Sequence, residues 1–142
     1  DGIENAKIIS SVNVASNAES AAAAAISLLN ENPQINVLVG FNEWMTLGVG
    51  EAIKQLNASE RVRGIGFDTN IESIEKLETG EIDTLIVQNP FAIGYLGVKY
   101  AAELISGGSI KENIIYTDVT AVTKDNLFDK DIQKLMFRFN QD

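Results

Sequence analysis

Residues 62–78 of this chain read VRGIGFDTNIESIEKLE. The first six residues are a short, mostly apolar run, which predicts a buried strand. Polar residues occupy positions 68–70, and Ile71, Ile74 and Leu77 then recur at a helical spacing. The stretch therefore predicts a strand, a polar exit and a helix, which is the repeating unit of a parallel α/β sheet.

Units of the same kind precede and follow this stretch. The predicted strands, rich in Ile and Val, are residues 7–12, 35–40, 62–67, 84–87 and 113–116, with 119–122 as a continuation of the last. The predicted helices are residues 16–31, 44–56, 71–78, 90–105 and 129–137. Strands that are apolar on both faces favour burial between two helix layers. We therefore predict an α/β fold, a doubly wound, mostly parallel sheet of about five strands with helices on both faces.

The first helix has the clearest boundary signals. Ser16-Asn17-Ala18-Glu19 fits a capping box, in which the Ser16 hydroxyl accepts a hydrogen bond from the Glu19 amide. An alanine-rich run follows, and Asn32-Pro33 ends it. Pro90 predicts the start of a later helix, and Gly80 predicts the end of the helix before it.

The composition is that of one globular domain. The chain has 142 residues, 45% of them hydrophobic and 22% charged, and no apolar run is long enough to span a membrane. Twenty acidic residues against eleven basic ones give a net charge of −9, which disfavours nucleic acid and anionic lipid as partners. The first residues carry no targeting signal and no initiator Met, so we expect a processed chain or an excised piece.

Two residue types are missing from the chain, Cys and His. Their absence excludes a thiolate nucleophile, a disulfide, an imidazole base and the common zinc sites. We therefore expect that the chain is not an enzyme and that it holds no metal and no cofactor.

Polar residues follow the predicted strands where a doubly wound sheet binds its ligands, beyond the carboxyl ends of the strands. Ser16 follows the first strand, Asn42 the second, Asp68 the third and Gln88 the fourth, with no Lys or Arg among them. Amides both donate and accept hydrogen bonds, and an ionised Asp can accept from two hydroxyl groups. This set suits a neutral polyhydroxyl ligand such as a sugar.

The same residues have a second interpretation that involves no ligand. Asn, Asp and Ser after a strand are common helix N-caps, each contributing about 1 kcal/mol of stability. For any single position the two interpretations are about equally supported, whereas four such positions at one edge favour a ligand site.

Several stretches together resemble a known family. They are Asn32-Pro33-Gln34-Ile35-Asn36, Phe41-Asn42-Glu43-Trp44-Met45-Thr46-Leu47-Gly48, Val62-Arg63-Gly64-Ile65-Gly66-Phe67-Asp68 and Val87-Gln88-Asn89-Pro90-Phe91-Ala92-Ile93-Gly94-Tyr95. In this order they resemble the C-terminal lobe of type I periplasmic binding proteins, the ribose-binding and galactose-binding family. The resemblance implies that residues 1–142 form one C-terminal ligand-binding lobe, without the N-terminal lobe that would complete the clamp.

The resemblance also implies roles for individual residues. Asn42 would hydrogen-bond sugar hydroxyls, Asp68 would accept from a pair of them, and Gln88 would contact another hydroxyl or the ring oxygen. The chain departs from ribose-type proteins at the turn before the first helix, where it has Ser16 and Asn17 in place of an aromatic residue. Ser16 and Asn17 are also expected to bind the ligand.

At the level of the whole protein, the resemblance implies the substrate-binding component of a sugar ABC importer. Its partners would be a sugar, the membrane ABC permease and the N-terminal lobe, with no nucleic acid bound by this chain. Its location would be extracytoplasmic, in the periplasm or lipid-anchored at the cell surface. The alternatives are the effector lobe of a lactose-repressor-type regulator and an extracellular sensor domain, which share the fold.

Overall fold

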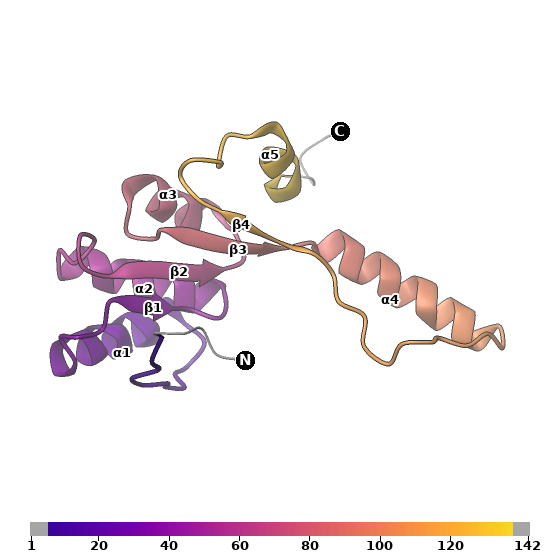
Figure 1. Ribbon diagram of the computed structural model, residues 1–142, viewed down its shortest axis with the longest axis horizontal. Helices are drawn as coiled ribbons and strands as arrows, with labels where there is room; N and C mark the ends of the chain where they lie inside the picture. Colours follow the sequence, from indigo (N-terminus) through magenta and orange to yellow (C-terminus); the bar gives the residue numbers. More distant parts are fainter. Residues whose placement is uncertain (1–5, 138–142) are drawn as a thin grey trace.

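Four strands form one sheet in the order β1-β2-β3-β4 (Figure 1). The computed structural model describes residues 6–137. β1, β2 and β3 are parallel, with Leu38 opposite Gly64 and Gly66 opposite Leu85. β4 runs antiparallel to β3. In chain order the elements are α1 (Ala18–Glu31), β1 (Val37–Val39), α2 (Glu43–Gln55), β2 (Arg63–Phe67), α3 (Ile71–Thr79), β3 (Thr84–Gln88), α4 (Pro90–Ile105), β4 (Val119–Val122) and α5 (Lys130–Met136).

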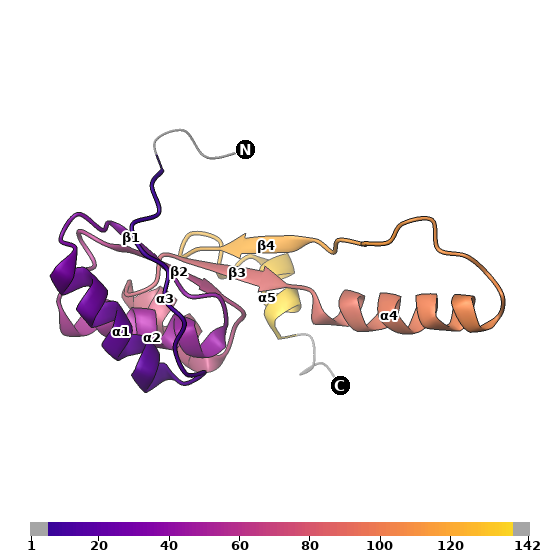
Figure 2. The ribbon, with the colours of Figure 1, turned by 90° about the horizontal axis from the view of Figure 1, so that it is seen from below.

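The core lies between the sheet and the helices on one of its faces, and Figure 2 shows α1, α2, α3 and α5 on that side. Residues without a large side chain let these layers approach closely. A Cβ at Gly66 would overlap the side chain of Thr46 in α2, and a Cβ at Gly48 would overlap Ala21 in α1. Ile53 of α2 is fully buried against this face. Small residues at the crossing points therefore set the spacing of the helix layer.

Asparagine caps four of the five helices. Asn17, Asn42, Asn70 and Asn89 accept a hydrogen bond from the backbone amide three residues further on, at the starts of α1, α2, α3 and α4. The first helix begins at Ala18 with Asn17 as its cap, so the prediction that Ser16 caps it is wrong by one residue. The backbone of Asn17 is extended, at φ −148° and ψ 155°, which is the conformation that an N-cap needs.

The α/β class and the mostly parallel sheet are confirmed, but two predicted strands are absent from the described residues. Residues 7–12 form no strand, and Ile8 is 86% exposed; β1 is an edge strand of the sheet and pairs only with β2. Residues 113–116 lie in the connection between α4 and β4, away from any strand, and Tyr116 is 87% exposed. The alternative segment, residues 119–122, is the strand β4.

The sequence predicts helices on both faces of the sheet, and the arrangement in the structure differs from this. α4 extends away from the sheet instead of packing on it, and it buries none of its residues (Figures 1 and 2). The direction of β4 allows this arrangement. A parallel neighbour requires a crossover over the sheet, whereas an antiparallel neighbour can be reached from the same end.

No helix among residues 6–137 combines the length and the apolar character needed to cross a lipid bilayer.

The contact between α1 and α2 gives a test of this packing. Gly48→Ala adds a methyl group against Ala21, so we expect it to lower the free energy of unfolding by about 1–3 kcal/mol. Gly94→Ala in α4 is the matched control, because nothing lies within 4 Å of the added group and Ala favours a helix. Urea unfolding followed by circular dichroism measures both. Equal midpoints for the two variants would contradict the close packing of α1 on α2.

Candidate functional site

Three of the predicted site residues lie at one edge of the sheet. Because β1, β2 and β3 are parallel, their carboxyl ends share this edge, and α2, α3 and α4 begin there. Asn42 caps the helix that follows β1, Asp68 comes directly after β2, and Gln88 is the last residue of β3. The structure therefore places them on neighbouring strands in spatial order.

Asp68 and Gln88 form a hydrogen-bonded pair. The Gln88 Nε2 group donates to Asp68 Oδ1 at 2.8 Å. Asp68 has a φ of 65°, in the left-handed region, and its backbone amide donates to the Ile86 carbonyl at 3.1 Å. Within residues 6–137, Asp68 Oδ2 and Gln88 Oε1 accept no hydrogen bond. The pair therefore holds two oxygen acceptors in a fixed relation at the edge.

A buried hydroxyl group links Asn42 to this pair. Thr46 is fully buried, and its Oγ1 accepts from the Phe67 amide at 3.0 Å. The same hydroxyl lies 2.9 Å from the Asn42 carbonyl oxygen and 3.1 Å from the Phe67 carbonyl oxygen, to either of which it can donate. The first turn of α2 is thereby tied to the end of β2, one residue before Asp68. This bridge fixes the position of Asn42 relative to Asp68.

The cap interpretation of Asn42 is confirmed, and it leaves part of the side chain available. Asn42 Oδ1 accepts from the Met45 amide at 2.9 Å. Its Nδ2 group donates to nothing among residues 6–137. Asn42 can therefore cap α2 and donate to a ligand at the same time, and its contact with a ligand stays a prediction.

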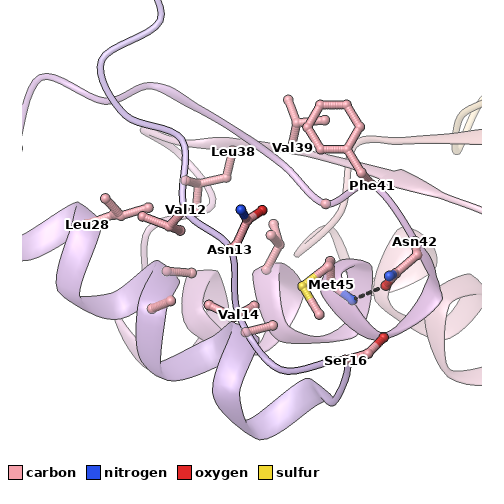
Figure 3. Close-up of a pocket in the computed structure, with 15 residues that line it drawn as sticks. Val12, Asn13, Val14, Ser16, Leu28, Leu38, Val39, Phe41, Asn42 and Met45 are labelled. Atoms are coloured by element: carbon pink, nitrogen blue, oxygen red, sulfur yellow. Dashed lines mark hydrogen bonds between the residues drawn. The ribbon is translucent and has the colours of Figure 1, made fainter.

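Ser16 and Asn17 lie elsewhere. Asn17 is occupied as the cap of α1, accepting from the Ser20 amide at 2.8 Å. Ser16 lines a cavity of about 270 Å³ between residues 12–16, α1, β1 and α2, and Figure 3 shows it at the same end of this cavity as Asn42. The cavity walls are mostly apolar, and Asp68 and Gln88 do not line it. The structure therefore brings Ser16 near Asn42 but not near the Asp68–Gln88 pair.

Two features of the edge were missed at the sequence level. Asn70 Nδ2 donates to Glu43 Oε1, which joins the first turns of α2 and α3. The Asn70-x-x-Ser73 capping box was a visible signal for Asn70, because its two reciprocal hydrogen bonds are present at 2.7 and 2.9 Å. Phe41 is 75% exposed beside Asn42, and its ring packs on Phe67 at 5.7 Å between centroids.

The charged side chains described at this edge, Glu43 and Asp68, are acidic, and two basic side chains are paired away from it. Arg63 pairs with Asp83 at 2.7 Å at the opposite edge, where β2 begins. Lys76 pairs with Glu51 at 3.4 Å between α3 and α2. Within residues 6–137, no group of three or more carboxylates converges as a metal site would require. The chemistry of the edge is therefore hydrogen bonding by amides and a carboxylate.

Comparison with known proteins identifies relatives of the chain. A family described as periplasmic binding protein domain matches residues 2–109. The D-allose-binding periplasmic protein of Escherichia coli (strain K12) is 28% identical over 86 residues, which are 61% of this chain and 28% of that protein. The ribose import binding protein of Bacillus subtilis (strain 168) is 27% identical over 88 residues, which are 62% of this chain and 28% of that protein. The chain thus spans under a third of the length of these two relatives.

Solved structures agree with these matches. An ABC transporter solute binding protein from Agrobacterium vitis, with bound D-fucose, has a TM-score of 0.79 at 27% identity, over 92% of this chain and 45% of that one. A carbohydrate transporter solute binding protein from Agrobacterium radiobacter, in complex with D-arabinose, has a TM-score of 0.74 at 33% identity, over 84% of this chain and 40% of that one. The relatives are solute-binding proteins, which confirms the expectation that the chain is not an enzyme.

The Thr46 bridge can be tested by removing its hydroxyl group. Thr46→Val leaves the half-buried Phe67 amide without its acceptor, so we expect about 1–3 kcal/mol less stability and faster hydrogen exchange at that amide. Thr46→Ser keeps the hydroxyl group and is expected to keep the amide protected. NMR hydrogen exchange reads the Phe67 amide directly. Equal protection in the two variants would show that the bridge does not hold the end of β2.

Proposed function

The chain belongs to the periplasmic binding protein family, and from this membership we propose that it is the C-terminal ligand-binding lobe of a sugar-binding protein that serves an ABC importer. The observation that carries the proposal is the Asp68–Gln88 pair next to Asn42, at the carboxyl edge of three parallel strands. Doubly wound sheets bind their ligands at this edge.

The hydrogen-bonding capacity of these groups supports a sugar. Asp68 Oδ2 and Gln88 Oε1 can each accept from a hydroxyl group, and Asn42 Nδ2 can donate to a hydroxyl or ring oxygen. The acceptors are held by the hydrogen bond between Asp68 and Gln88, so little side-chain freedom is lost when a ligand binds. A polyhydroxyl molecule satisfies both kinds of group at once.

The charge of the edge supports a neutral ligand. Asp68 is accompanied by Glu43, and the cations Arg63 and Lys76 are paired away from the edge. A phosphate or carboxylate ligand would meet these acidic groups without a cation to balance it. D-Fucose and D-arabinose, bound by two of the structural relatives, are neutral sugars.

A single edge contacts only one side of a ligand, so the proposal includes a second lobe. Contacts from both lobes would stabilise the closed form of a clamp over the open form, and the ABC permease would then distinguish the two. The protein would work outside the cytoplasm, in the periplasm or lipid-anchored at the cell surface, and this lobe would bind no nucleic acid. The chain alone is expected to bind sugar more weakly than a two-lobed protein does.

Asp68 gives the direct test of the ligand site. The side-chain amide signals of Asn42 and Gln88 can be followed by NMR while D-ribose, D-allose, D-arabinose and D-fucose are added in turn. We expect one of these sugars to shift both signals, and Asp68→Asn to weaken that binding roughly 10-fold or more, because it removes a charged acceptor.

Asp131→Asn is the matched control, because it makes the same change of charge on a carboxylate that is 94% exposed in α5. Its sugar affinity is expected to equal that of the unchanged chain. A sugar that binds without shifting the Asn42 and Gln88 signals, or with equal affinity to both variants, would rule out this edge as the site.

The preference for a neutral ligand is tested with a charged one. D-Ribose 5-phosphate is expected to bind roughly 10-fold more weakly than D-ribose, because its phosphate meets Asp68 and Glu43 in a chain of net charge −9. Raising the salt concentration should narrow the difference by screening the repulsion. Isothermal titration calorimetry of both compounds at two ionic strengths measures it. Tighter binding of the phosphate at low salt would overturn the preference.

A further inference from the structure

The turn between β2 and α3 begins at Asp68 and ends at Asn70, and α2 holds it at both ends. Before the turn, the Thr46 hydroxyl group accepts from the Phe67 amide at 3.0 Å. At the end of the turn, Glu43 Oε1 accepts from Asn70 Nδ2. Glu43 and Thr46 are three residues apart in α2, so they lie on the same side of that helix. Two contacts from one side of α2 therefore hold the turn before and after Asp68.

Asn70 uses all the polar atoms of its side chain, which fixes the direction of its bond to Glu43. Its Oδ1 accepts from the Ser73 amide at 2.7 Å, and its backbone amide donates to Ser73 Oγ at 2.9 Å. Ser73 is 1% exposed, so this capping box is anchored in the core. The remaining group of the Asn70 side chain is Nδ2, which donates to Glu43. Ser73 and Glu43 together therefore set the orientation of the residue that ends the turn.

The turn depends on such anchors because Asp68 has an uncommon backbone conformation. Its φ of 65° lies in the left-handed region, which residues with a side chain seldom occupy. A residue in such a region stays there where the surrounding structure holds it. In an extended or right-handed conformation the Asp68 side chain would point in a different direction. Its 2.8 Å hydrogen bond from Gln88 Nε2 would then be lost.

We propose that Glu43 is a positioning residue of the sugar site: through Asn70 it keeps the carboxylate of Asp68 within reach of a sugar hydroxyl group. Glu43 itself makes no contact with the sugar. Its effect on sugar affinity rests on the proposed function, whereas its effect on the turn can be measured without any ligand.

The position of Glu43 at a helix start gives it a second role, which has to be separated from the first. Glu43 is the first residue of α2, where a carboxylate interacts favourably with the helix N-terminus. That interaction needs the negative charge, whereas the bond to Asn70 needs an oxygen acceptor. Glutamine keeps the acceptor and removes the charge, so Glu43→Gln separates the two roles.

The turn is measured first without ligand, by NMR of residues 1–142. The side-chain amide signals of Gln88 report its bond to Asp68, and hydrogen exchange at the Asp68 amide reports the bond to the Ile86 carbonyl. Glu43→Ala is expected to shift the Gln88 signals and to speed exchange at the Asp68 amide roughly 10-fold. Glu43→Gln is expected to leave both unchanged, because it keeps an acceptor for Asn70.

Sugar affinity is measured next, by titration with D-ribose, D-allose, D-arabinose and D-fucose. Glu43→Ala is expected to weaken the binding of the sugar that binds by roughly 5-fold, and Glu43→Gln to restore it. Asn70→Ser keeps a capping oxygen for α3 and removes the Nδ2 donor, so we expect the same loss. The double variant is expected to bind no more weakly than either single variant, because both substitutions remove one and the same bond.

Glu72→Ala is the matched control. It removes the same charge from the first turn of α3, and Glu72 is exposed, with no hydrogen bond or ion pair among residues 6–137. Its sugar affinity, Gln88 signals and Asp68 exchange are expected to equal those of the unchanged chain.

Three outcomes would overturn the proposal. In the first, Glu43→Gln loses as much sugar affinity as Glu43→Ala, so that the charge matters and the bond does not. In the second, the losses of Glu43→Ala and Asn70→Ser add in the double variant. In the third, Glu43→Ala leaves the Gln88 signals and the Asp68 exchange unchanged. Absence of sugar binding by the unchanged chain would count against the proposed function, and the ligand-free measurements would still decide whether Glu43 positions the turn.

Discussion

The candidate site depends on one buried hydroxyl group. The Thr46 side chain of α2 can lie against β2 only because Gly66 has no side chain to exclude it. From that position its oxygen accepts from the Phe67 amide and lies within hydrogen-bond distance of the Asn42 carbonyl. The left-handed turn at Asp68 begins one residue later, and the hydrogen bond to Gln88 follows from it. A missing side chain on the sheet thus determines where the candidate ligand-binding groups lie.

The sequence predicted most of what depends on local pattern. The periodicity of apolar residues located α2, α3 and α4 to within a residue or two and the three parallel strands to within a few residues, and the likeness to sugar-binding lobes led to the right family. It failed at residues 7–12, which pair with no strand although β1 has a free edge, because local periodicity does not show whether a segment joins a sheet. It failed on the second helix layer for a related reason. The periodicity of apolar residues in these two segments does not show the direction of β4, and a crossover of α4 over the sheet depends on that direction.

The same holds for the candidate site: features that depend on local pattern could be predicted from the sequence, and features that depend on tertiary contacts could not. Asn42, Asp68 and Gln88 could be assigned to one edge, because each follows a strand and parallel strands end together. The hydrogen bond between Asp68 and Gln88 joins residues twenty positions apart, so only the register of β2 against β3 reveals it. Ser16 and Asn17 are adjacent residues with similar capping ability, and the backbone conformation of Asn17 decides between them.

The four asparagine caps give the chain a particular response to chemical ageing. Loss of the side-chain amide converts asparagine to aspartate, which can still accept the capping hydrogen bond and adds a charge that a helix N-terminus favours. Asn17 and Asn89 could change in this way without harm to α1 or α4. At Asn70 the same reaction would set two carboxylates against each other, because its amide donates to Glu43. Deamidation would therefore leave the outer helices capped and separate the first turns of α2 and α3, at the edge that holds the candidate site.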